Sequence, residues 1–532
     1  MQGLRVPADI FALKSIGIDA WRSRVFWPVS DAEYSELANL VLDEFDRVLV
    51  RLDPGDSNLL LCDSTFAAFL IKHFHALLVQ ARIRQMGAEL MIGRVQQAYR
   101  PDWEVLQVPL VLERRSSVRW KMRLREFVKG VAFSSSRPVT ERLKSAFGTS
   151  DYVCVGSYGK LLERYLAEKT QSSCAYMYPQ SFIGESDVSP MPSPNSKMED
   201  AVRMLLENLN GEIRERFDLE FDVFGAASCW VRRIEFLRGV EHAIRAKARM
   251  PRQLFCTEPA SSMHKLLSKV VLEAGGRVTA FAHGNDPGLL MNRMTGYVQM
   301  SLCSEFVCPS ARSTELYRDV LSLTSIGQLH EVEYVSLSEN QFQDWHLQFG
   351  REGNATPPKS VMVIGYPMNP TRYVLSQGDF FLFQLDLELQ ILRCLRRMGL
   401  RTIYKMHPDR IDEARGLFET ECDEVMVSPF ETVWSAADAF VFPCTTSTTF
   451  GFALCTPRPI VVVDVPGLKW NPRVYPGLSR RCRMVPASIT PENRLLLDQV
   501  ALIAALGPDA DRWDDRFVSE FMYPQVRQQV TQ

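Results

Sequence analysis

The sequence predicts an α/β protein whose parallel sheets carry helices on both faces and divide between two domains. Short apolar runs closed by Gly or a polar turn alternate with helically spaced segments, in residues 253–322 and again in 361–464. The chain has 532 residues, which is more than one hydrophobic core normally supports. A polar stretch with Gly and Pro, residues 336–358, separates the two series. We therefore expect two α/β domains joined near residue 350.

The composition is that of a soluble globular protein, with 46% hydrophobic and 23% charged residues. The formal net charge of −2 argues against a protein that binds nucleic acid in bulk. Twelve cysteines occur without CxxC pairs or a Cys/His ligand spacing, so neither a zinc site nor a disulfide framework is indicated. Free thiols fit a reducing cytoplasm, which is the location we expect.

The N-terminal third contains no chemical motif in its first hundred residues. Residues 1–18 lack the pattern of a signal peptide. The most apolar window, 59–81, contains Asp63 and further polar side chains, which predicts a buried helix rather than a membrane span. For residues 1–150 we expect an α/β layer with strands at 47–51 and 59–62 and a helix at 64–84 capped by Asp63.

Residues 114–129 interleave basic side chains with Trp, Met, Leu and Phe. Such an amphipathic segment suits an anionic membrane surface or an acidic acceptor, and it equally suits a solvated helix face. Residues 151–169 are expected to form a helix, and the Ser- and Pro-rich stretch 172–198 a long loop or flap that carries Glu185 and Asp187. Two further helices are expected at 198–215 and 228–250.

Two polar side chains end neighbouring strands of the first predicted sheet. The strand at 253–258 ends in Glu258, and the strand at 277–282 is followed by His283. The carboxyl ends of parallel strands share one edge, so this pair suits proton transfer or a carboxylate nucleophile. The alternative is structural, with Glu258 capping the helix that starts near residue 261 and His283 bonding to a loop carbonyl.

The second domain is predicted to begin near residue 359. The expected strands are 361–365, 401–404, 424–427, 439–442 and 459–464, and the expected helices are 380–398, 411–418, 430–437 and 448–455. From residue 472 onward the chain is expected to be helical, with 513–523 packing on the first domain. The predicted domain bounds are 1–350, 359–505 and, for a C-terminal helical tail, 506–532.

Two motifs follow strands of this second sheet. His407 and Pro408 come directly after one strand, and a run of hydroxyl residues, 445–449, follows another and opens a helix. In such sheets ligands bind beyond the carboxyl ends of the strands, where hydroxyls and free N–H groups can hold a phosphate. The alternatives are a hydrogen-bonded loop histidine and an ordinary N-cap. Together the two motifs predict a phosphate or nucleotide site.

These motifs and their order resemble the GT-B glycosyltransferases of bacterial surface-polysaccharide synthesis, such as lipopolysaccharide and capsule enzymes. The sequence is similar to CMP-sugar-dependent Kdo transferases and polysialyltransferases, and more distantly to CDP-glycerol glycerophosphotransferases. The resemblance covers residues 254–464 and rests on four short motifs: Phe-Ala-His-Gly at 281–284, Asn-Pro-Thr-Arg-Tyr at 369–373, Lys-Met-His-Pro at 405–408 and Thr-Thr-Ser-Thr-Thr at 445–449. It implies two Rossmann-like domains whose parallel sheets face a central cleft.

The resemblance also implies roles for individual residues. The nucleotide-binding set is Arg372, Lys405, His407, Pro408, Thr446, Ser447 and Thr448. The implied catalytic residues are Glu258 and His283, with Glu185 or Asp187 as less favoured bases. Family examples carry Asp where this chain has Glu258, and Asn285 and Asp286 replace a Gly-rich run, so a retaining or an inverting outcome stays open.

The implied activity is transfer of a sugar, an ulosonic acid in the leading hypothesis, from a CMP-activated donor to a surface-polysaccharide or lipid-linked glycan acceptor. No cofactor and no metal are expected, since the one DxD pair, Asp509 and Asp511, lies in the tail. Two alternatives remain: a CDP-alcohol-dependent phosphotransferase, and a non-catalytic component of a polysaccharide assembly complex. A peripheral contact with the inner membrane is compatible with each of these functions.

Overall fold

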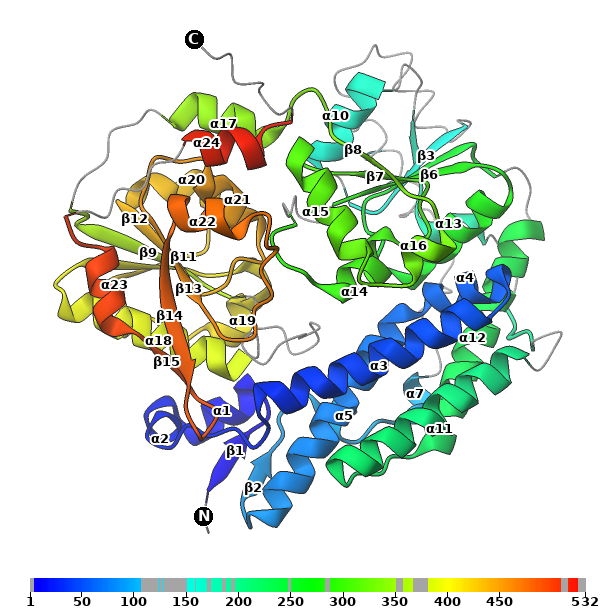
Figure 1. Cartoon of the computed structure of the whole chain (residues 1–532), viewed down its shortest axis with the longest axis horizontal. Coiled ribbons are helices and arrows are strands. Elements are labelled where there is room, and N and C mark those ends of the chain that lie inside the picture. Colours follow the sequence, from blue (N-terminus) through cyan, green and yellow to red (C-terminus); the bar gives the residue numbers. More distant parts are fainter. Residues whose placement is uncertain are drawn as a thin grey trace.

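The computed structural model contains two parallel sheets in separate halves of the molecule (Figure 1). It describes residues 4–106, 124, 128, 151–157, 159–169, 174–183, 188–192, 197–246, 250–282, 288–350, 357–366, 381–508 and 515–524. Helices pack against both sheets, so the predicted architecture of two Rossmann-like α/β domains is confirmed. The two sheets fall on either side of the predicted domain boundary.

The first sheet has six strands in the order β4-β3-β5-β6-β7-β8, and every neighbouring pair is parallel. Its strands are β3 (Tyr152–Val155), β4 (Ala175–Tyr176), β5 (Gln253–Cys256), β6 (Arg277–Phe281), β7 (Glu305–Val307) and β8 (Glu333–Val335). The helices that connect or flank them are α10 (Lys160–Lys169), η1 (Pro179–Phe182), α13 (Ser262–Glu273), α14 (Arg293–Thr295), η3 (Gly296–Met300), α15 (Ala311–Leu321), α16 (Ile326–Leu329) and α17 (Gln341–Phe349).

The second sheet has seven strands in the order β11-β10-β9-β12-β13-β14-β15, parallel except for the last pair. Its strands are β9 (Ser360–Ile364), β10 (Arg401–Lys405), β11 (Glu424–Met426), β12 (Ala439–Phe442), β13 (Ile460–Asp464), β14 (Arg483–Ile489) and β15 (Leu495–Leu497). The helices of this half are α18 (Phe381–Arg397), η5 (Pro408–Arg410), α19 (Ile411–Ala414), α20 (Phe430–Val433), η6 (Trp434–Ala436), α21 (Thr448–Leu454), α22 (Tyr475–Arg481) and α23 (Gln499–Ala505).

A layer of helices, most of them long, lies below the first sheet in Figure 1. Its helices are α3 (Asp31–Arg51), α4 (Pro54–Cys62), α5 (Ser64–Gln85), α6 (Gln96–Tyr99), α7 (Trp103–Leu106), α11 (Lys197–Phe217) and α12 (Val223–Ala246). The expected strands at 47–51 and 59–62 are therefore wrong. Residues 47–51 complete α3, whose buried positions Phe45, Val48 and Leu49 keep helical spacing after a capping box at Ser30 and Glu33.

Asp63 precedes α5 as predicted, but its carboxylate does not cap the helix. It pairs with Arg233 of α12 at 2.6 Å, and both side chains are buried. Helix α5 is long and apolar enough, by composition, to cross a bilayer, yet 61% of its most apolar window is buried in the fold. All twelve cysteines are buried free thiols.

Three further boundaries differ from the prediction. Residues 151–169 begin with β3 and not with a helix, because Tyr152–Val155 is an apolar run that pairs with β5. The stretch 172–198 contains the short strand β4 and the turn η1. Beyond residue 472 the chain adds β14 and β15 to the sheet, in addition to helices.

Both ends of the chain tie the two halves together. The N-terminal segment, with β1 (Arg5–Pro7), α1 (Ile10–Ile16) and α2 (Ile18–Arg22), reaches the second half, where Trp27 N–H donates to the Glu492 carbonyl at 3.0 Å. Strand β1 pairs with β2 (Glu89–Met91). At the other end, α24 (Asp515–Phe517) and η7 (Val518–Met522) return to the first half, and Ser310 Oγ donates to the Phe521 carbonyl at 2.6 Å. The predicted return of this tail segment is confirmed for residues 515–524.

Candidate functional site

The candidate site is built on three adjacent strand ends of the second sheet. Strand β9 lies between β10 and β12, so the turn after β10 and the loop after β12 flank the exit of β9. Neighbouring strands are about 4.8 Å apart, which puts the ends of β10 and β12 roughly 10 Å from each other. That distance suits a ribose and its phosphate.

The turn after β10 presents His407. Its ring is 19% exposed, and Nδ1 accepts the N–H of Asp409 at 3.2 Å, which caps η5. A neutral ring that accepts at Nδ1 carries its proton on Nε2, and an N–H donor of this kind is what a phosphate oxygen requires. Pro408 follows at the first position of η5 and is exposed.

Lys405, which the resemblance assigns to the nucleotide site, directs its ammonium to the backbone. It is only 6% exposed, and its ammonium donates to the Met406 carbonyl at 2.8 Å. Burial lowers the pKa of Lys405, and the carboxylate of Glu431 opposes that shift. The ammonium thus holds the backbone of its own turn, and its part in nucleotide binding stays a prediction.

A buried ion pair supports this turn from beneath. Arg410 and Glu388 are both fully buried; Arg410 Nη1 donates to Glu388 Oε2 at 3.0 Å and to the Tyr404 hydroxyl at 2.8 Å. The same Nη1 donates to the Tyr366 carbonyl at 2.6 Å, and the Tyr366 N–H donates to Glu388 Oε1 at 2.6 Å. The network therefore fixes the end of β9 against the end of β10.

Sequence reasoning missed Arg410 and Glu388. The only available signal was a charged side chain, Glu388, between the buried Leu387 and Leu389 in the predicted helix 380–398. Its partner lies 22 positions away and becomes its neighbour only in the fold.

The loop after β12 carries hydroxyls that the described chain leaves without partners. Thr445 is 5% exposed, and its Oγ1 is buried without a hydrogen-bond partner among the described residues. Ser447 Oγ is buried and unpartnered in the same sense, although Ser447 stands at the N-cap of α21. Thr446 is exposed, with Oγ1 3.0 Å from Cys444 Sγ, and Thr448 begins α21. A buried hydroxyl without a partner is costly, so this loop is suited to form hydrogen bonds with a ligand.

A segment of the first half lies directly against this loop. Gly288, Leu289 and Leu290 line a cavity of about 30 Å³ together with Thr445 and Thr446. The two halves are bonded beside it, since Asn471 N–H donates to the Leu289 carbonyl at 2.8 Å and Met291 N–H to the Lys469 carbonyl at 2.7 Å. The hydroxyl loop is thus at the interface of the two domains. A larger cavity of about 760 Å³ lies elsewhere, along α18, and none of the predicted site residues line it.

Glu258 lies two residues beyond β5, which ends at Cys256 and not at the predicted residue 258, and it is partly buried. Its backbone carbonyl accepts Nδ1–H of His264 at 2.9 Å, and burial lowers the pKa of His264. Gly156, at the end of β3 with φ of 100°, packs so closely that a Cβ there would lie 3.0 Å from the Glu258 nitrogen. Glu258 does not line the cavity at the hydroxyl loop, so its catalytic role stays a prediction.

Several predicted residues lie outside the described part of the chain. They are His283, Arg372, Glu185, Asp187, Asn285, Asp286, Asp509, Asp511 and all of the basic segment 114–129 except Leu124 and Val128. Among the described residues, no group of three or more His, Cys, Asp or Glu side chains forms a metal-binding cluster.

Comparisons with known proteins add little to this geometry. No family model matches the chain, and no curated protein matches it. Among solved structures, the chain is similar to a UDP-GlcNAc 2-epimerase of Methanocaldococcus jannaschii in complex with UDP-GlcNAc and UDP. The alignment has 9% sequence identity and a TM-score of 0.36 and covers 70% of this chain and 96% of the epimerase. A likeness at this level carries no argument about function.

Proposed function

We propose that the protein is a glycosyltransferase that takes a sugar from a CMP-activated donor, with an ulosonic acid as the leading candidate, and transfers it to a surface-polysaccharide or lipid-linked glycan. The observation that carries the proposal is the pair of buried hydroxyls in the loop after β12, Thr445 and Ser447, which have no partner among the described residues; Thr445 also lines the cavity at the domain interface. The choice of CMP rests on the sequence resemblance.

In this proposal the donor phosphate lies across the ends of β10, β9 and β12. Nε2–H of His407 and the hydroxyls of Thr445 and Ser447 donate to its oxygens. As the bond between sugar and phosphate breaks, negative charge grows on the phosphate, and preorganised donors stabilise it without reorganising. The buried Arg410–Glu388 pair holds His407 in place and does not touch the ligand.

Across the interface, the acceptor hydroxyl loses its proton as it attacks the anomeric carbon. Glu258 and His283 are the proposed groups for this step, either as base or, for Glu258, as a nucleophile in a retaining reaction. We also propose that no metal takes part. Addition of EDTA should therefore leave the rate unchanged.

Donor hydrolysis tests the proposal. The purified protein is incubated with CMP-Kdo, CMP-sialic acid or CDP-glycerol, and release of the nucleotide is measured. Release of CMP from one CMP-sugar, lost in His407→Ala and in Ser447→Ala, supports a CMP-sugar transferase. Turnover of CDP-glycerol alone would replace it with a phosphotransferase, and absence of turnover together with absence of nucleotide binding would indicate an assembly protein.

A further inference from the structure

An open groove with five arginines runs along the outer face of α18, away from the predicted nucleotide site. The arginine groove, as we call it, has a volume of about 760 Å³. Its arginines come from α2, α18 and the residue before β15: Arg22, Arg393, Arg396, Arg397 and Arg494. None of the residues assigned to donor or acceptor binding line it.

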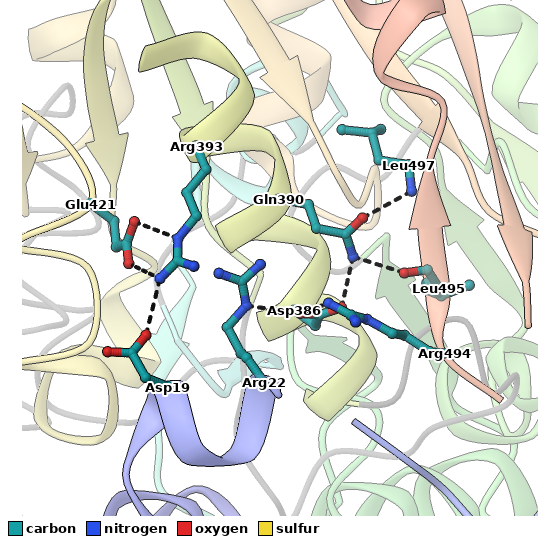
Figure 2. Close-up of polar contacts among 9 residues, drawn as sticks. All are labelled: Asp19, Arg22, Asp386, Gln390, Arg393, Glu421, Arg494, Leu495 and Leu497. Atoms are coloured by element: carbon teal, nitrogen blue, oxygen red, sulfur yellow. Dashed lines mark hydrogen bonds and ion pairs between the residues drawn. The ribbon is translucent and has the colours of Figure 1, made fainter. Parts of the chain in front are cut away.

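The inner two arginines share one carboxylate. Asp386, 1% exposed, accepts Arg494 Nε at 2.7 Å and Arg22 Nε at 3.1 Å, and Gln390 bonds to it as well (Figure 2). One negative charge therefore faces two guanidinium groups. Arg22 Nη1 is buried and has no hydrogen-bond partner among the described residues. In Figure 2 this guanidinium points between Arg393 and Gln390.

The outer part of the groove adds three more arginines. Arg393 donates to Glu421 Oε2 at 2.8 Å and lies 3.4 Å from Asp19 (Figure 2). Arg396 and Arg397 are exposed and donate to neutral oxygens, the Thr420 carbonyl at 2.8 Å and the Gln499 amide at 2.7 Å. Five guanidinium groups thus meet four carboxylates: Asp19, Asp386 and Glu421 in ion pairs, and Asp423, whose pKa the charge of Arg396 helps to lower. The ion pairs Arg22–Asp386 and Arg393–Asp19 attach α2 to α18, but they do not neutralise all of the arginines in the groove.

One side of the groove has an apolar edge. Leu496, which lines the groove, is 41% exposed, and Val500 and Ile503 of α23 are 78% and 48% exposed. On a helix, Gln499, Val500 and Ile503 fall within an arc of about 100°, so the two aliphatic side chains lie on the same side as the groove-lining Gln499. Leu496 thus lines the groove itself, and Val500 and Ile503 are exposed on the helix that contributes Gln499 to it.

We propose that the arginine groove and its apolar edge dock the protein on an anionic lipid surface. Guanidinium groups bind phosphates in planar, bidentate geometry, which suits the phosphates of lipid headgroups. Leu496, Val500 and Ile503 enter the boundary between headgroups and acyl chains, where aliphatic side chains are stabilised. A soluble phosphate would use the arginines but would leave the three aliphatic side chains in water, which is why a membrane is the favoured source of the phosphate.

The test uses the full-length protein and sedimentation with vesicles of phosphatidylcholine, alone or mixed with phosphatidylglycerol. We expect binding only to the anionic vesicles. Binding should weaken as salt is added, because the screening length falls from about 10 Å at 0.1 M to about 3 Å at 1 M. Arg396→Ala/Arg397→Ala should bind about 30-fold more weakly, since each arginine near an anionic surface contributes about 1 kcal/mol.

Two further variants test whether vesicle binding depends on the groove itself or only on the total positive charge of the protein. Arg214→Ala/Arg216→Ala removes the same charge from exposed positions on α11 and should bind like wild type. Val500→Ser/Ile503→Ser keeps every arginine and should bind about tenfold more weakly. All of these positions are exposed, so the variants should fold, which circular dichroism would verify.

Three results would overturn the proposal. Equal binding of wild type to neutral and anionic vesicles, or to neither, would remove the lipid surface as the partner. Wild-type binding by Arg396→Ala/Arg397→Ala would move the contact elsewhere, for example to residues 114–129. Binding of inorganic pyrophosphate without binding of vesicles would make the groove a site for a soluble anion.

Discussion

The ends of β10 and β12 lie on either side of β9 in one sheet, yet they differ in how their buried polar groups are bonded. Beneath the turn after β10, Arg410 Nη1 reaches Glu388, Tyr404 and the Tyr366 carbonyl within 3.1 Å. In the loop after β12, the hydroxyls of Thr445 and Ser447 are buried without partners among the described residues. Polar groups that bond to one another hold the fold, whereas buried groups left unpaired are the better candidates for holding a ligand.

The largest effect is expected from breaking the network under β10. Arg410→Met leaves Glu388 buried without its counter-charge and should lower the free energy of unfolding by about 3–5 kcal/mol. Urea unfolding followed by circular dichroism measures this. Arg410→Met/Glu388→Leu removes both charges and should lose less than the single variant. A loss below about 1 kcal/mol in Arg410→Met would show that the pair does not support the turn.

The stability cost of Arg410→Met should also depend on pH, because Glu388 can take up a proton. Burial raises the pKa of Glu388, and Arg410 opposes the shift. A carboxyl whose pKa is raised in the folded state contributes its full stability below the unfolded pKa of about 4.3 and loses it as pH rises through the folded pKa. Arg410→Met raises that pKa further. The cost of Arg410→Met should therefore shrink as pH falls through the raised folded-state pKa of Glu388 in the variant, by at most about 1.4 kcal/mol for each pH unit. A constant or growing cost toward acid pH would contradict this account.

A smaller effect contrasts two threonines of the second domain. Thr456 is fully buried and its Oγ1 donates to the Ala453 carbonyl at 2.8 Å, whereas Thr445 Oγ1 has no partner among the described residues. Thr456→Val should lower the free energy of unfolding by about 1 kcal/mol. Thr445→Val should leave it unchanged or raise it by up to about 1 kcal/mol, because a desolvated hydroxyl is removed. Equal losses in both variants would mean that Thr445 is bonded in the folded protein.

Much of the second sheet could be predicted from the sequence, because buried parallel strands such as β12 and β13 are continuous apolar runs. The same signal failed at 47–51, where the apolar run Val-Leu-Val between two arginines completes a helix of 21 residues. The missed strand β3 resembled the start of the helix that follows it. Long-range packing decides both cases, and the local pattern does not contain it.

Some residues of the candidate site could be found from the sequence, and others could not. His407 and the hydroxyl run could be found because each directly follows a strand and the topology places strand ends together. The Arg410–Glu388 pair could not be found, since its partners meet only in the fold. Nor could sequence spacing show that Lys405 turns its ammonium to the backbone.

The most direct test of the central claim is a titration of CMP, followed by thermal shift and by calorimetry, on wild type, Thr445→Val and Thr456→Val. UDP and GDP serve as competing nucleotides. Wild type should bind CMP preferentially. Thr445→Val should bind about tenfold or more weakly with its stability intact, because a hydrogen bond to a charged group contributes about 1.5–3 kcal/mol. Thr456→Val should lose stability and keep the CMP affinity of wild type. CMP binding that is unchanged in Thr445→Val, or absent in wild type, would contradict a nucleotide site at the loop after β12.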